Sequence, residues 1–210
     1  MSARDEVLGR VRRALADVDR AQEEAPLPAR TGGEHGLQAE LVDLFAERVE
    51  DYRATVVRCT HGEVPGAIAL ALAGAASVLV PDGFPPEWLG AGEPDGVHRV
   101  EDAGLTAAAL DRVAAIVSTA AVGIAATGTI VLDHGPGQGR RALTLVPDLH
   151  VCVVRAAQVV ADVPSAVGVL DPGRPQTWVS GPSATSDIEL DRVEGVHGPR
   201  TLHVILVGSG

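Results

Sequence analysis

A glycine-rich loop followed by two arginines could bind an anion. The loop reads Gly135-Pro136-Gly137-Gln138-Gly139, and Arg140-Arg141 follows it directly. Glycine tolerates positive φ, so such a loop can turn its backbone N–H groups toward a ligand while guanidinium groups neutralise the charge. The alternative is a hairpin in which the glycines serve only the turn. The predicted anion site consists of Gly137, Gln138, Gly139, Arg140 and Arg141.

Two common nucleotide-binding loops do not match this stretch. Gly123 and Gly128 have the glycine spacing of a P-loop, but Thr129-Ile130 replaces the required Lys-Ser/Thr pair. The 135–139 loop is not GxGxxG, and the arginine-containing segment after it is predicted to be a strand, whereas a Rossmann site needs a helix there. Loops rich in Gly, Thr and Ser at the ends of strands still suit a ligand site, which adds Thr127, Gly128 and Thr129 to the candidates.

A second polar loop offers further candidates. Ser180 and Ser183 lie between a predicted strand and a predicted helix, where backbone N–H groups can hold an anion. Ordinary helix capping explains one such side chain equally well. Asp133, Asp187 and His197 are candidate acid–base residues, although a histidine on an exposed loop is often only solvated.

Metal and cluster chemistry have little support. The seven histidines form no HxxxH or HxH pair, which disfavours a metal site, and no GxSxG motif indicates a hydrolase. Two cysteines, Cys59 and Cys152, are too few to ligate an iron–sulfur cluster and are expected to be reduced core thiols. We therefore expect no metal and no cofactor on this chain.

Composition limits the partners. The 210 residues carry a formal net charge of −11, which argues against a nucleic-acid partner. The longest weakly polar run, 66–80, is too short to cross a bilayer, and the N-terminal segment is charged through Arg20, unlike a secretory signal. We expect no membrane partner and a cytoplasmic location.

Helical and strand periodicities alternate along most of the chain. Apolar spacing predicts an amphipathic helix over 3–19, and a segment rich in Pro, Gly and Glu over 20–35 indicates a linker. We therefore divide the chain into an N-terminal helix with its linker, 1–35, and an α/β domain, 36–210. Short connections between strands and helices favour a largely parallel central sheet. Helices are predicted over 36–51, 64–73, 106–113, 163–170 and 186–191, and strands over 55–59, 77–80, 97–100, 114–118, 157–160, 177–180 and 202–207.

Several of these segments together resemble the LUD-domain family and, within it, the lactate utilisation protein C (LutC) group. The matching blocks are Thr127–Leu132, Gly137–Arg140, Leu145–Pro147 with His150, Ser180–Ser183 with Asp187–Glu189, Gly195–Pro199, and the opening Val7–Arg12. The resemblance implies a three-layer α/β/α sandwich like that of ribose-5-phosphate isomerase, glucosamine-6-phosphate deaminase and CoA transferases. It also implies a role in oxidising L-lactate to pyruvate beside iron–sulfur partner subunits, with this subunit free of clusters and binding a small anionic ligand or a partner.

One position departs from the family pattern. Members usually carry a glutamate just before Thr-Gly-Thr, where this chain has Ala126. That difference favours a binding or assembly role over a glutamate-dependent transferase. Two alternatives stay open. The first is a stand-alone enzyme of the isomerase/CoA-transferase class that acts on a sugar phosphate or an acyl-CoA, with Asp133, Asp187 or His197 as acid or base. The second is a pure assembly protein that docks through its N-terminal helix.

Overall fold

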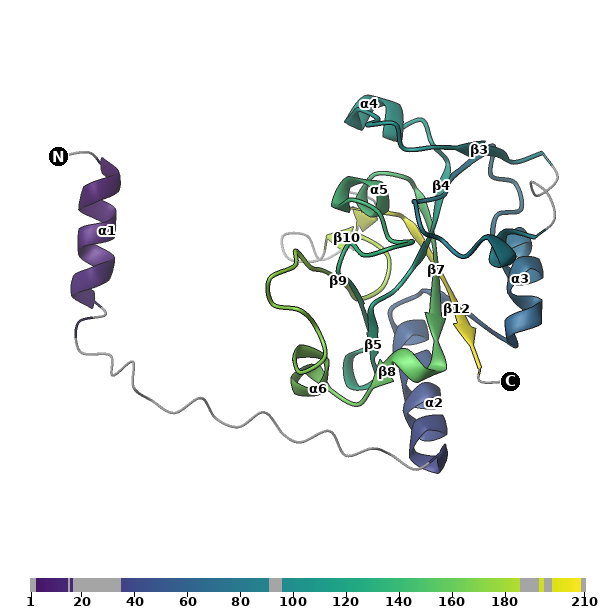
Figure 1. Cartoon of the computed structure of the whole chain (residues 1–210), viewed down its shortest axis with the longest axis horizontal. Helices are drawn as coiled ribbons and strands as arrows, with labels where there is room; N and C mark the ends of the chain where they lie inside the picture. Colours follow the sequence, from purple (N-terminus) through teal and green to yellow (C-terminus); the bar gives the residue numbers. More distant parts are fainter. Residues whose placement is uncertain are drawn as a thin grey trace.

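A computed structural model describes residues 3–14, 16, 35–90, 96–185, 193–194 and 198–208 (Figure 1). Helix α1 spans Ala3–Ala14, and residues 15 and 17–19 of the predicted helix over 3–19 lie outside the described residues. The rest of the described chain forms an α/β unit from helix α2, His35–Asp51, to strand β12, Thr201–Val207. The predicted helix over 186–191 lies entirely outside the described residues.

A six-stranded parallel sheet forms the centre of this unit. Its order is β1-β12-β7-β4-β2-β3, and every neighbouring pair is parallel. Residues 202–207 of β12 are predominantly apolar because the strand is central, with helices or a second sheet against both of its faces. The bounds are β1 Thr55–Cys59, β2 Ser77–Leu79, β3 His98–Val100, β4 Ala115–Thr119, β7 Leu149–Arg155 and β12 Thr201–Val207.

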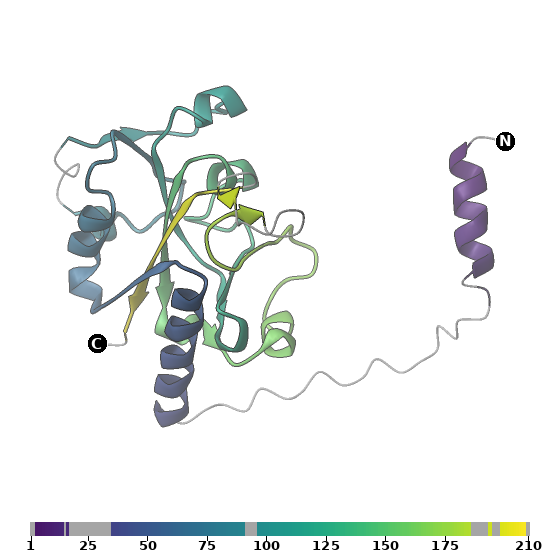
Figure 2. The same ribbon diagram turned by 180° about the vertical axis from the view of Figure 1, so that it is seen from behind.

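Different layers cover the two faces of the sheet (Figures 1 and 2). Helix α3, Val64–Ala71, and the short 3-10 helix η2, Pro86–Leu89, pack on one face, where Trp88 is fully buried. Helix α2 packs on the other face through Phe45 and Val49, beside a second sheet.

The second sheet has the order β8-β5-β6-β9 and comes from three separate parts of the chain. Strand β5, Val122–Ile124, turns through the 3-10 helix η3, Ala125–Thr127, into antiparallel β6, Thr129–Leu132. The edges are β8, Val159–Val160, and β9, Thr177–Val179. Helix α6, Val163–Val167, covers the outer face of β5 and β6 through Ala166.

The remaining elements are short connections. They are 3-10 helix η1, His61–Glu63, helix α4, Ala107–Leu110, helix α5, Arg141–Leu145, 3-10 helix η4, Ala156–Gln158, and the antiparallel pair β10, Ala184–Thr185, with β11, Val193–Glu194. Among the described residues, no helix is long and apolar enough to span a membrane.

The predicted α/β class with a large parallel sheet is confirmed, and one local prediction is wrong. The segment after the glycine loop is helix α5 and not a strand. Leu143 belongs to a core cluster with Leu79 and Ile116, and Ala142 and Val146, which are four residues apart, pack against that cluster. That spacing fits one helix face, so packing decides against an extended strand.

Candidate functional site

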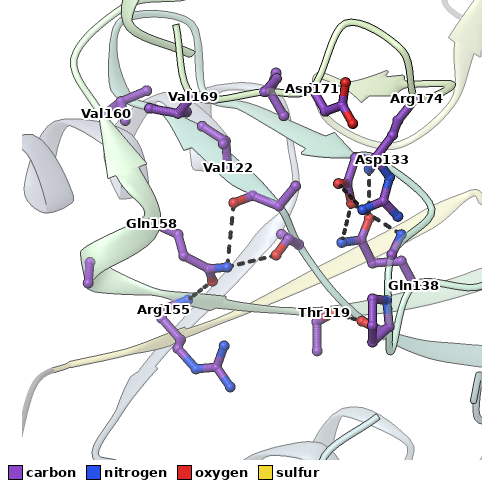
Figure 3. Close-up of a pocket in the computed structure, with 16 residues that line it drawn as sticks. Thr119, Val122, Asp133, Gln138, Arg155, Gln158, Val160, Val169, Asp171 and Arg174 are labelled. Atoms are coloured by element: carbon purple, nitrogen blue, oxygen red, sulfur yellow. Dashed lines mark hydrogen bonds and ion pairs between the residues drawn. The ribbon is translucent and has the colours of Figure 1, made fainter. Parts of the chain in front are cut away.

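A cavity of about 540 Å³ opens where two central strands, β4 and β7, reach their carboxyl ends (Figure 3). Thr119 is the last residue of β4 and Arg155 the last residue of β7, and both line the cavity. Loops at the carboxyl ends of parallel strands are where α/β sheets bind ligands. The other lining residues come from strands β5 and β8 of the second sheet, from residues 133–138, from η4 and from residues 169–174.

The glycine loop lies across the end of β4 and is held there by backbone hydrogen bonds. The Thr119 N–H donates to the Gly137 carbonyl at 2.9 Å, and the Gly137 N–H donates to the Asp82 carbonyl at 2.8 Å. Gly137 has a φ of 75°, and an added Cβ would lie 3.0 Å from the Thr119 side chain, so glycine is required there. The N–H groups of Gly135, Gly137 and Gln138 all donate to acceptors within the chain. These three groups are therefore engaged in the fold, not turned toward a ligand as the sequence suggested.

Gln138 is an internal brace of this loop. Its side chain is 4% exposed, and its Oε1 accepts hydrogen bonds from the backbone N–H groups of Asp133 at 2.7 Å and His134 at 3.1 Å. Its Nε2 donates to Asp133 Oδ1 at 2.9 Å. Asp133 Oδ2 pairs with Arg174 Nη1 at 3.1 Å. The predicted acid–base candidate Asp133 thus lines the cavity as one half of an ion pair.

His134 joins the loop to the second sheet. Its Nδ1 lies 3.0 Å from the Gly139 carbonyl oxygen and its Nε2 lies 3.1 Å from Thr177 Oγ1. A carbonyl oxygen can only accept, so Nδ1 carries the proton and donates. In the neutral ring Nε2 then accepts from the Thr177 hydroxyl. This bridge fixes the open side of the loop against β9.

Arg155 and Gln158 form the opposite side of the cavity, as Figure 3 shows. Gln158 Nε2 donates to the Ala120 carbonyl at 2.8 Å, and its Oε1 accepts from the Arg155 backbone N–H at 3.0 Å. The Arg155 guanidinium lies over the Trp88 ring, 4.7 Å from its centroid. Stacking uses the flat face of a guanidinium and leaves the N–H groups at its edge to donate. No acidic residue in the described part of the chain pairs with Arg155.

Arg140 and Arg141 lie on the far side of the glycine loop from this cavity's polar wall. Arg140 makes a two-pronged contact with Asp102, with Nε at 2.8 Å and Nη2 at 3.0 Å, and Nη2 also donates to the Leu105 carbonyl at 2.6 Å. These hydrogen bonds lower the pKa of Asp102 and raise the pKa of Arg140. Gly139 and Arg140 line a separate cavity of about 440 Å³ with Asp82 and Asp102. Arg141 is exposed at the start of α5.

The predicted Thr127–Thr129 turn lies elsewhere, against helix α2. Thr127 Oγ1 lies 2.7 Å from Thr129 Oγ1, which lies 2.8 Å from Ser180 Oγ. Gly128 has a φ of 57°, and an added Cβ would lie 2.6 Å from the Arg48 backbone. The turn therefore packs closely on α2 and is not among the residues that line the 540 Å³ cavity. Ala126, in η3, is exposed and does not line that cavity either.

Ser180 and Ser183 border a third cavity of about 260 Å³ together with His150. The Ser183 N–H donates to the Pro199 carbonyl at 2.8 Å. His150 is 1% exposed, its Nε2 lies 2.7 Å from Ser118 Oγ, and burial lowers its pKa to about 4. His150 is consequently neutral at physiological pH. The candidates Asp187 and His197 lie outside the described residues, so they cannot be placed relative to this cavity.

The described residues contain no group of three or more His, Cys, Asp or Glu side chains placed to hold a metal ion. Both cysteines are free thiols, and burial raises the pKa of Cys152 to about 12. Of the predicted residues, the structure therefore places Gln138 and Asp133 in the lining of the 540 Å³ cavity. Gly139 and Arg140 line another cavity, and the 127–129 turn and the two serines lie elsewhere.

A family model described as the LUD domain matches residues 42–207. This chain belongs to the LUD domain family. The LUD protein is 47% identical to lactate utilization protein C of Deinococcus radiodurans over 98% of this chain and 96% of that one. It is 30% identical to lactate utilization protein C of Bacillus subtilis over 41% of this chain and 39% of that one. A crystal structure of a DUF162 family protein from Deinococcus radiodurans superposes with a TM-score of 0.70 and 45% identity, covering 81% of this chain and 98% of that one.

In this LUD protein we call the 540 Å³ cavity the main cavity. Sequence reasoning did not identify most of the residues that line it, among them Arg155, Gln158 and Arg174. Arg155 carried a usable signal, because it ends the apolar run of β7 and residues that end parallel strands face the ligand edge. Arg174 had no comparable signal, because it lies in a turn and its ion-pair partner Asp133 is distant in sequence.

Proposed function

We propose that this LUD protein is a cytoplasmic component of a system that oxidises L-lactate to pyruvate, and that it binds a small carboxylate in the cavity between the ends of β4 and β7. The observation that carries the proposal is the 47% identity to lactate utilization protein C over nearly the whole length of both chains. The redox step then belongs to iron–sulfur partner subunits, because two free thiols on this chain cannot ligate a cluster.

Arg155 is the group that we assign to the anion. Lactate and pyruvate are carboxylates, and an arginine edge presents paired N–H donors that match a carboxylate. The stacking on Trp88 holds the guanidinium in one place before a ligand arrives. Arg174, neutralised in part by Asp133, supports the same negative charge from the opposite wall.

Growth on L-lactate as sole carbon source tests the role of the protein. Deletion of the gene is expected to abolish growth, and complementation with Arg155→Gln is expected to restore it poorly. Arg112→Gln is the matched control, because Arg112 is exposed and lies away from the cavities described above. Normal growth of the deletion strain, in a host with no second lactate pathway, would refute the lactate assignment.

The residues predicted from sequence define a competing position for the anion. If Gly137–Gly139 with Arg140 and Arg141 form the site, the double variant Arg140→Ala, Arg141→Ala should abolish lactate binding in calorimetry and Arg155→Gln should not. We expect the reverse, because Arg140 is already paired with Asp102. Stabilisation and turnover with ribose phosphates or CoA esters would instead favour the stand-alone enzyme, with Asp133 as its acid or base.

A further inference from the structure

The two sides of the main cavity differ in chemistry. One side is polar and consists of the ion pair Asp133–Arg174 with the Gln138 amide. On the side that carries Arg155 and Gln158, the wall continues as an aliphatic surface, and Figure 3 shows Val122, Val160 and Val169 lying together there, away from the Asp133–Arg174 pair. The aliphatic side is made by Val122, Val160, Val169 and Leu170.

These aliphatic residues belong to the outer layer of the second sheet. Val122 and Leu170 are buried in the cluster that α6 forms with β5, and Val160 packs against that cluster. Val169 is 40% exposed, so an apolar side chain meets solvent at the cavity. A ligand that covered it would remove apolar surface from water, which favours binding. The wall therefore offers binding energy to a carbon chain and none to a carboxylate.

The volume of the cavity exceeds what lactate fills. Lactate has about six non-hydrogen atoms, and at roughly 30 Å³ for each, the share of one water in the liquid, it takes at most about 180 Å³. That is a third of about 540 Å³. Cavities of roughly 300–1,000 Å³ usually hold ligands several times larger than lactate. A lactate molecule at Arg155 would leave the aliphatic wall in contact with water only.

We propose that the cavity binds a carboxylate that carries an aliphatic chain longer than that of lactate, with the carboxylate at Arg155 and the chain along Val160, Val169 and Leu170. The inference rests on the proposed function in placing the anion at Arg155 and in taking 2-hydroxy and 2-oxo acids as the ligand class. Within that class, the aliphatic wall favours an acid with an extended apolar substituent.

Calorimetry with straight-chain 2-hydroxy acids, from lactate to 2-hydroxyoctanoate, tests the inference on the full-length protein. Each added methylene that reaches the wall is expected to tighten binding about fourfold, since a buried CH₂ contributes about 0.8 kcal/mol. Val169→Asn should reduce this gain per methylene to about twofold or less and leave lactate affinity unchanged. Val163→Asn is the matched control, because Val163 is also 40% exposed and does not line the cavity.

The possible results distinguish the longer-chain inference from the proposed anion site at Arg155. Arg155→Gln should weaken every acid in the series by the same factor and leave the gain per methylene intact. If lactate binds through Arg155 but affinity is flat or falls with chain length, the inference is overturned and the anion site stands. If no acid in the series binds, the anion site itself is overturned. If Val163→Asn reduces the gain in affinity per methylene as much as Val169→Asn does, the aliphatic chain of the ligand lies outside the cavity. That result would also overturn the inference.

Discussion

Replacing Gln138 with leucine is expected to destabilise the protein although the two side chains are similar in size. Gln138 is 4% exposed and makes three side-chain hydrogen bonds, at 2.7, 2.9 and 3.1 Å. Leucine leaves the half-buried N–H groups of Asp133 and His134 without their acceptor and the Asp133 carboxylate without a donor. At about 1 kcal/mol for each lost partner, the expected loss is about 2 to 4 kcal/mol. For a chain of this size that lowers Tm by about 5 to 15 °C.

Urea unfolding measures this loss directly, provided that the slope with denaturant is the same in both proteins. Gln176→Leu is the control, because Gln176 is only partly buried and its two side-chain hydrogen bonds are exposed, so that water can replace them. We expect that control to change the unfolding free energy by less than about 0.5 kcal/mol. A Gln138→Leu loss no larger than that of Gln176→Leu would refute the assignment of Gln138 as a brace and leave it free to bind a ligand.

Gln138→Glu tests the accepting oxygen and the donating nitrogen of the Gln138 amide separately. The carboxylate still accepts from both N–H groups, but it no longer donates to Asp133 and instead repels it. That repulsion raises the pKa of one of the two carboxyls in the folded state. A raised acid pKa costs stability as pH rises above the unfolded value, so the deficit of this variant should be largest near pH 7 and should shrink toward pH 4.

Two further predictions concern the folded framework. Burial lowers the pKa of His150 from 6.5 to about 4, so the unfolded chain binds its proton first and stability falls as pH drops from about 6.5 to 4. The folding stability of the native protein relative to His150→Gln should therefore drop by about 3 kcal/mol between pH 7.5 and pH 4, measured by denaturant unfolding. Equal losses in both proteins would contradict this. Gly128→Ala should lower Tm more than Gly74→Ala does: both have positive φ, but only at Gly128 would the new Cβ meet backbone, 2.6 Å away. Similar Tm values for the two variants would mean that η3 can move away from α2.

The parallel sheet was predictable because the apolar pattern of each short sequence segment is enough to indicate a strand. The run at 202–207 is apolar except for His203, as is typical of a strand covered on both faces, and short turns separate strands from helices elsewhere. Strands were predicted over 157–160 and 177–180, but not their pairing with β5 and β6 in a second sheet, which the structure shows at 159–160 and 177–179. A strand of two or three residues has no periodicity of its own, and its partner is chosen by the tertiary fold.

The division of the candidate site between separate cavities has the same origin. Thr127–Thr129 and Gly137–Arg140 are close in sequence, yet strand β6 lies between them and carries the chain from α2 to the end of β4. From residue type alone, both segments were predicted to be ligand-binding loops. Their hydrogen-bond partners, Ser180 in one case and Asp82 and Thr119 in the other, lie far away in sequence and could be identified only in three dimensions.

The hydrogen bonds that each arginine already makes support our proposal that Arg155, which lies outside the glycine motif, is the anion ligand. The conspicuous loop uses its N–H groups and Arg140 to close the fold over β4, with acceptors supplied by Asp82, Asp102 and the loop itself. Arg155 has its flat face against Trp88 and no carboxylate among the described residues at its edge. A cation held in place by an aromatic ring but not neutralised by an acid retains its attraction for a ligand. In this LUD protein the glycine loop thus closes over the end of β4, and Arg140 is held by Asp102. Arg155, the last residue of β7, is the arginine that we propose as the ligand of the anion.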